Sequence, residues 1–435
     1  MSATVLTGLP ATELARLLRE RAVSAADVVE AHLRRIEAVD GALNAVVALD
    51  AERALATARG ADAVDEPRGP LHGVPFTVKD NLEATGIAMA IGDPERVGVV
   101  PTRDATAVHR LRAAGAILLG KTNCPLYGGG IETDNELYGR TSNPYDLERT
   151  PGGSSGGEAA IVAAAGSALG VGTDSGASVR LPAHFCGLAA IKPTAGRVPV
   201  TGVIYDEGQI GALGDARTQV GPLARSVADV ALALRVLSGP DGRDGGIAPV
   251  ALGDPAAVRL AGLRVAAFGA YDHAEADPAT AAVLADAAGA LSDAGAIVEE
   301  AAPPAGGHDI TIEVWRSYGG ELDSLGLYRL LRRWDAFRTE MLAWGERYDL
   351  LLSPVFAGPA PPHGALANHR GVDPTSFTTP HSLTGWPAAT VRCGSSPEGL
   401  PIGMQVVARP WRDDVALAAA LALERALGGW RSAPL

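Results

Sequence analysis

Cysteine is scarce in this chain of 435 residues, and the few cysteines lie far apart. The three of them are Cys124, Cys186 and Cys393. An odd and sparse cysteine count is typical of a protein in a reducing compartment, and the spacing matches no metal-binding motif. The nine histidines are scattered too, and no pair has the H-E-x-x-H spacing of a zinc protease. The sequence therefore predicts no metal site, and it carries no motif for a cofactor.

Positive charge is also in short supply. The chain has 37 lysines and arginines against 50 aspartates and glutamates, which gives a net charge of −13, and it contains no block of basic residues. Nucleic acids and anionic membranes attract basic surfaces. We therefore expect neither a nucleic-acid partner nor a membrane partner.

Long apolar runs are missing as well. The longest uncharged apolar stretch near the middle of the chain, residues 159–173, is too short to span a bilayer and contains glycines and a serine. The first residues, MSATVLTGLPATELARLL, lack the basic segment and the apolar segment of a signal peptide. These features predict a cytoplasmic protein.

The sequence does contain enough apolar material for a large core. Hydrophobic residues make up 47% of the chain and charged residues 20%, close to the average for globular proteins. Residues 11–63 are expected to be helical, with Ser24 at the start of an apolar stripe. Residues 72–80 predict a strand that enters a turn, and residues 104–123 begin with a helix that stops at Gly115.

The alternation of helix and strand continues along the chain. A buried strand is expected over residues 116–119, and residues 157–174 predict a helix followed by a strand. Later segments predict a helix in 226–242, a strand in 260–270, a helix and then a strand in 278–301, an amphipathic helix in 314–337 and a final helix in 412–427. No repeat and no long polar linker interrupts the pattern. The chain is therefore predicted to form one large α/β domain around a mostly buried sheet.

The stretch PGGSSGGEAA, residues 151–160, has the composition of a flexible linker but stands close to elements on both sides. Ser155 and Glu158 have the spacing of a capping box just before an apolar run, so Ser155 is predicted to cap a helix. The flanking glycines permit backbone angles that other residues resist, and a glycine turn before a helix also presents amide N–H groups. Ser154 precedes the predicted cap and is left without a structural role.

A second turn of small residues, GTDSGASVRLPA, occupies residues 172–183 after a predicted strand. Its backbone N–H groups could converge on one oxygen atom and form an oxyanion hole. Ser178 ends this turn. A serine at that position could attack a carbonyl group while its own turn binds the developing oxyanion.

A serine nucleophile needs a base, and no histidine stands in a recognisable nucleophile-elbow arrangement in this sequence. A lysine can serve if it is neutral, and burial lowers the pKa of a lysine by disfavouring its charged form. Lys79 follows the apolar run GVPFTV, and a strand there would carry it inward. Taken alone, Lys79 could equally be a surface lysine paired with Asp80.

Three stretches taken together resemble the amidase signature family. They are GVPFTVKDN, TPGGSSGGEAAIVAAAGSALGVGTDSGASVRLPAHFCGLAAIKPT and LTGWPAATVRCGSSPEGLPIGMQVVARPWRD. The resemblance implies one domain with three α/β/α layers, in which helices cover both faces of a central, mixed and twisted sheet. It divides the chain 1–435 into a helical N-terminal region 1–63, a signature core of about 71–228, a variable pocket-covering region of about 300–375 and a C-terminal segment 376–435.

The resemblance also assigns a Ser–cis-Ser–Lys triad. The family's lysine falls on Lys79, its bridging serine, which follows a non-prolyl cis peptide bond, on Ser154, and its nucleophile on Ser178. The implied oxyanion hole is the backbone at Ser175, Gly176, Ala177 and Ser178. Asp174 and Arg180 fall on positions that tie this loop in place, as a buried ion pair. Ala177 departs from the family pattern, in which glycine is commoner, and its methyl group is expected to trim the space beside the nucleophile.

The resemblance places the acyl side of the pocket at the segment CPLYGGGI, residues 124–131. The implied substrate-binding residues are Tyr127, Gly128, Gly129, Gly130 and Ile131, although an ordinary glycine loop is the alternative. His381 and Trp386 are candidates for the pocket entrance, with a surface position for His381 and core packing for Trp386 as the alternatives. Glu132 and Asp134 are interpreted as loop-capping or solvated residues.

The implied activity is hydrolysis of a carboxylic amide through an acyl-enzyme on Ser178, with release of an acid and of ammonia or an amine. The substrate would be a small molecule, and a homodimer is one candidate for the assembly. The alternatives are the glutaminase subunit of a tRNA-dependent amidotransferase, an esterase, carbamate hydrolase or acyl transferase on the same triad, and a catalytically silent binding protein. The rather short chain and the weak match over residues 240–370 argue against the amidotransferase subunit.

Overall fold

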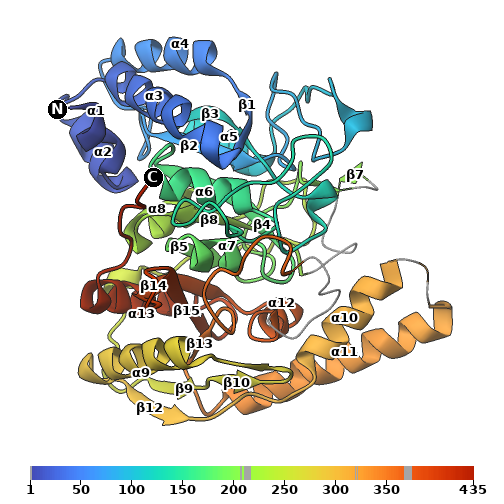
Figure 1. Cartoon of the computed structure of the whole chain (residues 1–435). Helices are drawn as coiled ribbons and strands as arrows, with labels where there is room; N and C mark the ends of the chain where they lie inside the picture. The colour runs from blue at the N-terminus through green and yellow to red at the C-terminus, as the bar shows by residue number, and fades with distance from the viewer. Residues whose placement is uncertain (1, 206–207, 210–216, 319, 321, 367–374) are drawn as a thin grey trace.

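One mixed sheet of eleven strands runs through the molecule (Figure 1). The computed structural model describes residues 2–205, 208–209, 217–318, 320, 322–366 and 375–435. The strands, in their order across the sheet, are β1 (Val46–Leu49), β3 (Ile117–Thr122), β2 (Pro75–Lys79), β4 (Leu169–Asp174), β8 (Gln219–Ala224), β5 (Ala189–Lys192), β14 (Ala388–Ser395), β15 (Pro401–Ala408), β13 (Leu350–Pro354), β9 (Arg264–Ala267) and β12 (Ile297–Glu300). The two halves of the chain therefore share one sheet, as expected for one domain.

Parallel and antiparallel pairs alternate in blocks across this sheet. β3, β2 and β4 are parallel neighbours, as are β13, β9 and β12, while the pairs from β4 through β15 to β13 are antiparallel. Every residue of β2, β4, β8 and β5 is buried. Strands covered on both faces read as continuous apolar runs, which is why these segments show little alternation in the sequence.

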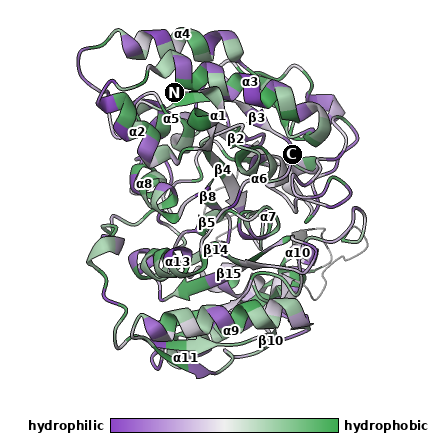
Figure 2. Cartoon of the chain, turned by 60° about the vertical axis from the view of Figure 1, so that its left-hand side comes forward, coloured by the Kyte–Doolittle hydropathy of each residue, from purple (hydrophilic) through white to green (hydrophobic). Residues whose placement is uncertain are grey.

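Helices cover both faces of the sheet, which gives the expected three layers. On one face lie α3 (Ala25–Leu43), α6 (Gly156–Ala163) and α7 (Arg180–Phe185). On the other lie α5 (Thr106–Ala113), α8 (Val227–Leu237), α9 (Pro278–Asp293) and α13 (Asp413–Leu427). Figure 2 shows that peripheral helices such as α3 and α4 carry hydrophilic as well as hydrophobic residues, as amphipathic helices do.

The remaining elements are shorter or lie outside the layers. The helices are α1 (Ala3–Gly8), α2 (Ala11–Arg19), α4 (Ala51–Asp62), α10 (Gly307–Tyr318), α11 (Ser324–Gly345) and α12 (Thr379–Thr384), and the 3-10 turns are η1 (Pro94–Arg96), η2 (Leu126–Gly128) and η3 (Pro255–Ala257). Two small hairpins are formed by β6 (Ile204–Tyr205) with β7 (Gly208–Gln209) and by β10 (Ala270–Tyr271) with β11 (Ala274–Glu275). Helices α10 and α11 form a hairpin that packs on α12 and projects from the body of the molecule (Figure 1).

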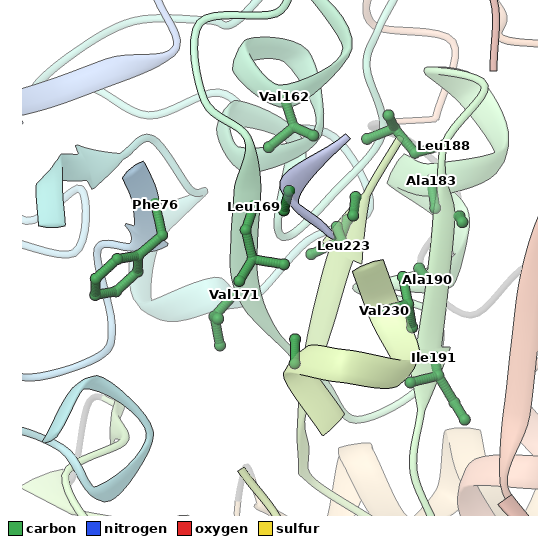
Figure 3. Close-up of a cluster of buried hydrophobic side chains, with 14 of the residues drawn as sticks. Phe76, Val162, Leu169, Val171, Ala183, Leu188, Ala190, Ile191, Leu223 and Val230 are labelled. Carbon is green, nitrogen blue, oxygen red and sulfur yellow. The ribbon is translucent and has the colours of Figure 1, made fainter. Parts of the chain in front are cut away.

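The main core fills the space between the central strands and their helices. Figure 3 shows Leu169 and Val171 of β4 and Ile191 of β5 in this cluster, with Val162 of α6 and Val230 of α8 contributed by the covering helices. These side chains are fully buried. At about 25 cal/mol per Å² of apolar surface, such burial is the main force that holds the layers together.

Three of the sequence expectations need correction. Residues 11–63 are not wholly helical, because Asn44 ends α3 with a left-handed φ of 52° and β1 follows, paired at the sheet edge with β3. The strand expected over 116–119 runs instead from Ile117 to Thr122. The segment 314–337 is divided between two helices, since α10 ends at Tyr318 and α11 begins at Ser324.

Other sequence expectations are confirmed. Ser24 caps α3, since its side chain accepts a hydrogen bond from the amide of Asp27. The helix and strand expected in 278–301 are α9 and β12, and the final helix is α13. Within the described residues, none of the helices is both long enough and apolar enough to span a bilayer.

Candidate active site

Lys79 ends β2, an interior strand of the sheet between β3 and β4, and its side chain is fully buried. Its Nζ donates to Oγ of Ser154 at 2.6 Å and to Oγ1 of Thr173 at 2.9 Å. Burial lowers the pKa of Lys79 to about 8, although nearby acidic groups oppose the change. The alternative of a surface pair with Asp80 is wrong, because Asp80 is buried and pairs with Lys121 at 3.3 Å.

Ser154 lies in the loop that precedes α6. The peptide bond between Gly153 and Ser154 is cis, as the family resemblance implies. The amide of Ser155 donates to the carbonyl oxygen of Ser178 at 3.1 Å. This bond joins the Ser154 loop to the Ser178 turn, so the three residues of the expected triad lie in one small region.

The predicted capping role of Ser155 is wrong. Ser155 stands at the N-cap position of α6, but its side chain makes no capping bond, and its Oγ donates to the carbonyl of Thr173 at 3.4 Å. The hydroxyl of Thr133 accepts from the first helical amide, that of Gly156, at 3.1 Å instead. A segment distant in sequence therefore serves the helix terminus that the local motif was expected to serve.

Glu158 explains why the capping box does not form. The N-terminus of α6 is buried against the sheet, and the Glu158 carboxylate accepts hydrogen bonds from Thr77 of β2 and Thr122 of β3. A side chain committed to the sheet cannot return to the helix terminus. Burial raises the pKa of Glu158 to about 8, although these two threonines favour the ionised form.

Ser178 stands in the turn between β4 and α7 and is partly exposed. Three carbonyl groups of this turn are bound: Gly176 O by Arg180 at 2.8 Å, Ala177 O by the amide of Leu181 at 2.7 Å, and Ser178 O by the amide of Ser155 at 3.1 Å. Within the part of the chain that the structure describes, no group accepts from the amides of residues 176–178. Donors held in this way can bind an oxyanion without reorganisation.

Asp174 and Arg180 form the buried ion pair that the resemblance implies. Nη2 of Arg180 lies 3.0 Å from Oδ1 of Asp174, and neither side chain is exposed. Asp174 also accepts from the amide of Val179 at 3.1 Å. Burial alone would raise the pKa of Asp174, but the charge of Arg180 and its hydrogen bonds outweigh burial and hold the pKa below its ordinary value. The pair therefore fixes both ends of the Ser178 turn.

Ala177 fits its position without backbone strain, because it is not among the residues with positive φ. Its methyl group is buried in an apolar cluster with Phe356 and Leu366, and Ile131 packs against the same cluster. The methyl group therefore packs in this cluster, and its expected effect on the space beside the nucleophile stays a prediction.

The segment 127–131 lies beside the Lys79–Ser154 pair. A Cβ built on Gly128, whose φ is +72°, would lie 3.5 Å from Oγ of Ser154 and 3.6 Å from Nζ of Lys79. Tyr127 donates its hydroxyl to Asp93. Gly129 and Gly130 are exposed. The placement of Gly128 next to Lys79 and Ser154, and of Ile131 against the cluster that holds Ala177, is compatible with a pocket wall, and the substrate-binding role of the whole segment stays a prediction.

The two candidates for the pocket entrance are buried. His381 is only 1% exposed, so the alternative of a surface position is wrong, and burial together with Arg180 and Lys192 holds its pKa well below the ordinary value. Trp386 is also 1% exposed and belongs to a second core cluster, which confirms its packing alternative. Since neither side chain reaches the surface, an entrance role for them has no support.

The acidic residues of the neighbouring loop behave as interpreted. Glu132 accepts hydrogen bonds from the amides of Gly364 and Leu366 at 2.9 and 2.7 Å, so it caps a distant loop. Asp134 is exposed. Across the described residues, no three histidine, cysteine, aspartate or glutamate side chains gather as a metal site would require.

Sequence reasoning missed three residues next to the site. Thr173 accepts from Lys79, and the Tyr205 hydroxyl lies 3.5 Å from the Thr173 hydroxyl. Trp315 of α10 meets the Ser178 turn at Gly176. Thr173 directly precedes Asp174 in the small-residue turn and could have been found from that motif. Trp315 lies in a segment without a motif, and only the fold brings it to the site.

Comparison with known proteins gives consistent matches over most of the chain. The model of the family described as Amidase matches residues 27–318 and 320–417. An acylamidase of Rhodococcus erythropolis is 34% identical, over 96% of this chain and 95% of that protein. A glutamyl-tRNA(Gln) amidotransferase subunit of Moorella thermoacetica is 33% identical, over 98% of both chains. The solved structure of 6-aminohexanoate cyclic dimer hydrolase with substrate is 30% identical and covers 99% of both chains, with a TM-score of 0.86.

Proposed function

The chain belongs to the amidase signature family of amide hydrolases, and we propose that it hydrolyses a small linear carboxylic amide. The reaction would pass through an acyl-enzyme on Ser178 and release an acid and ammonia or an amine. The observation that carries the proposal is the fully buried Lys79, whose lowered pKa leaves a usable neutral fraction and whose Nζ contacts Ser154. A free lysine in water would be almost wholly protonated at pH 7.

Acylation begins with two proton transfers. Neutral Lys79 accepts the proton of Ser154, and Ser154 accepts the proton of Ser178. The Ser178 oxygen forms a bond to the amide carbonyl carbon, and the carbonyl oxygen becomes an oxyanion. The amides of residues 176–178 are the proposed donors to it, supported by their lack of acceptors among the described residues.

Collapse of the tetrahedral intermediate breaks the C–N bond. Nitrogen must be protonated before it leaves, and Ser154 supplies that proton while Lys79 returns one to Ser154. Water then repeats the sequence on the ester of Ser178, with the same two groups as base, and the acid is released. The buried pair Asp174–Arg180 stays outside these transfers and keeps the turn in place.

Substitution of the three proposed catalytic residues tests this scheme. We expect Ser178→Ala to abolish hydrolysis of a panel of aliphatic and aromatic amides. Loss of the base or the relay in Lys79→Ala and Ser154→Ala should lower kcat/KM by about 10²- to 10⁴-fold. Ser292→Ala, an exposed serine on α9, is the control and should keep full activity. Full activity of any of the three site variants would refute the triad.

The amidotransferase subunit is a second candidate, and one observation favours it. The Moorella protein of that name is 33% identical over 98% of both chains, a match as extensive as that of the acylamidase, so identity and coverage do not separate the two functions. Hydrolysis of simple amides by the purified chain alone would support the amidase. Activity restricted to glutamine, and dependent on an added partner protein, would support the amidotransferase.

Assembly, location and reaction scope complete the proposal. We propose that the protein is a homodimer and that it lies in the cytoplasm; its three free and buried cysteines support only the second proposal, because they suit a reducing compartment. Sedimentation of the purified protein tests the assembly.

A screen that includes esters, ureas, carbamates and added amines as acyl acceptors would distinguish amidase from esterase, carbamate hydrolase or acyl transferase. A fluorophosphonate probe that fails to label the wild type would favour the silent binding protein.

A further inference from the structure

One aromatic side chain borders the Ser178 turn from outside the signature core. We propose that Trp315 is a specificity-determining wall of the acyl site and that Arg217 is the positioning residue that holds its ring. The proposal rests on the amidase function above and adds the class of acyl group: an apolar group whose width the indole limits.

The contact between Trp315 and the turn is direct. A Cβ built on Gly176 would lie 2.7 Å from both Cη2 and Cζ2 of the indole, so only glycine fits there with this ring in place. Trp315 comes from α10, in the hairpin that projects from the body (Figure 1). The ring is only partly buried, as suits a wall rather than a core residue.

Arg217 holds this ring in a stack. The Arg217 side chain is fully buried, and its guanidinium carbon lies 5.4 Å from the ring centroid of Trp315 and 6.0 Å from that of Trp334. Such cation–π contacts gain strength when they are shielded from water. Trp334 is anchored in turn, since its Nε1 donates to the carbonyl of Leu383 at 2.6 Å.

The stack also connects to the turn through the chain. Arg217 directly precedes Thr218, whose hydroxyl lies 2.5 Å from Oγ of Ser175 at the start of the turn. One short segment therefore fixes both the turn and the tryptophan that borders it. We expect this arrangement to restrain the indole relative to the proposed oxyanion donors.

A second apolar surface adjoins the turn at Ala177. Ala177 belongs to a buried cluster with Phe356 and Leu366, and Ile131 packs against that cluster. An acyl group bound at Ser178 would thus have an indole on the Gly176 side and aliphatic and aromatic carbons on the Ala177 side. These surfaces favour an apolar acyl chain, and the fixed indole sets the width that is tolerated.

Anilides with acyl groups of rising width test the wall. The substrates are the acetyl, butyryl, pivaloyl and benzoyl p-nitroanilides, and the readout is kcat/KM for each relative to the acetyl compound. We expect Trp315→Ala to raise the relative kcat/KM of the two wide acyl groups by about tenfold, since small changes in an apolar pocket have effects of this size. Trp315→Phe should change it less, in the same direction.

The control is Trp344→Ala, which removes a tryptophan of α11 that packs against Tyr348 instead of the turn. Its acyl preference should equal that of the wild type. An unchanged preference in both Trp315 variants would overturn the proposal, while a wild type that hydrolyses no amide or anilide would overturn the proposed function itself. If Trp315→Ala does not fold, Trp315→Phe alone decides the outcome.

Arg217 is tested through its coupling to Trp315. Arg217→Gln should shift the acyl preference in the same direction as Trp315→Phe, because the ring loses its stacked cation. In the Trp315→Ala background the same substitution should change the preference no further, since residues that act through one contact are not additive. If Arg217→Gln shifts the acyl preference by the same factor in the wild type and in Trp315→Ala, Arg217 does not act through Trp315.

Discussion

Lys79 has the environment that a lysine base requires, because the protein surrounds it with uncharged hydrogen-bond partners. Its Nζ contacts two hydroxyl groups, those of Ser154 and Thr173, and no carboxylate lies within ion-pair distance in the described chain. Burial is the larger influence on its pKa. The charged form therefore gains little from its neighbours, and the neutral form is accessible near physiological pH.

The pH dependence of the rate follows from this lysine. Only the neutral amine can accept the proton of Ser154, so kcat/KM should rise with pH and level off above about 8, the pKa of Lys79. Below that value the rate should fall about tenfold per pH unit, as for a single required base. A pH–rate profile with two unrelated neutral amides measures this. A profile that is flat between pH 6 and 9 would contradict the assignment.

The position of helix α6 was predicted correctly from the sequence, but the residue that caps it was not. Its start at Gly156 and the strand β4 after it agree with the sequence expectation, because both carry clear apolar patterns. The cap is different. Thr133 donates to the carbonyl of Gly152 at 2.9 Å and accepts from Gly156, so one hydroxyl binds the loop and the helix at once.

This arrangement predicts an order of stabilities at the start of α6. Thr133→Val removes the hydroxyl with little change in volume and should lower the free energy of unfolding by about 1 kcal/mol or more, as loss of an N-cap does. Ser155→Ala should cost less, since the hydrogen bond from its side chain to Thr173 is long, at 3.4 Å. Urea unfolding of both variants measures the difference. If Ser155→Ala lowers the free energy of unfolding more than Thr133→Val does, the result would support the predicted capping role of Ser155 instead.

The limits of sequence reasoning lie at contacts between distant segments. Lys79, Ser154 and Ser178 could be proposed as a triad from the sequence because each stands in a local motif and the motifs resemble those of a known family. Strand β1 was missed because four residues at a sheet edge, between two helices, give too short a pattern. Trp315 was missed because its meeting with Gly176 depends on how α10 packs, and no local pattern records that contact.

At the scale of the whole molecule, two buried ionisable groups near the site, Glu158 and Lys192, make the free energy of unfolding depend on pH. Burial raises the pKa of Glu158 to about 8 and lowers that of Lys192 to about 7, with Arg180 adding to the second effect. In the unfolded chain both groups return to ordinary values. Each group therefore links folding to pH, and the two act in opposite directions.

The sign for Glu158 is fixed by its raised pKa. The folded state keeps the proton up to about pH 8, while the unfolded chain releases it near the ordinary value of 4.5, so this group's contribution is complete at low pH and is lost as pH rises toward 8. Glu158→Gln removes that titration. The variant's free energy of unfolding, relative to wild type, should therefore be higher at pH 8 than at pH 5, by on the order of 1 kcal/mol or more.

Urea unfolding of both proteins at pH 5 and pH 8 measures the effect. The glutamine amide that replaces the carboxyl group contacts Thr77 and Thr122, and any destabilisation from these contacts is the same at both pH values. The difference between the two pH values therefore reports only the titration of Glu158. Glu424→Gln is a suitable comparison, since Glu424 is a half-buried glutamate on α13, away from the site, with a pKa that burial raises. If the stability difference between Glu158→Gln and wild type is the same at both pH values, the carboxyl group is not protonated in the folded protein, and Lys79 has a full negative charge close by.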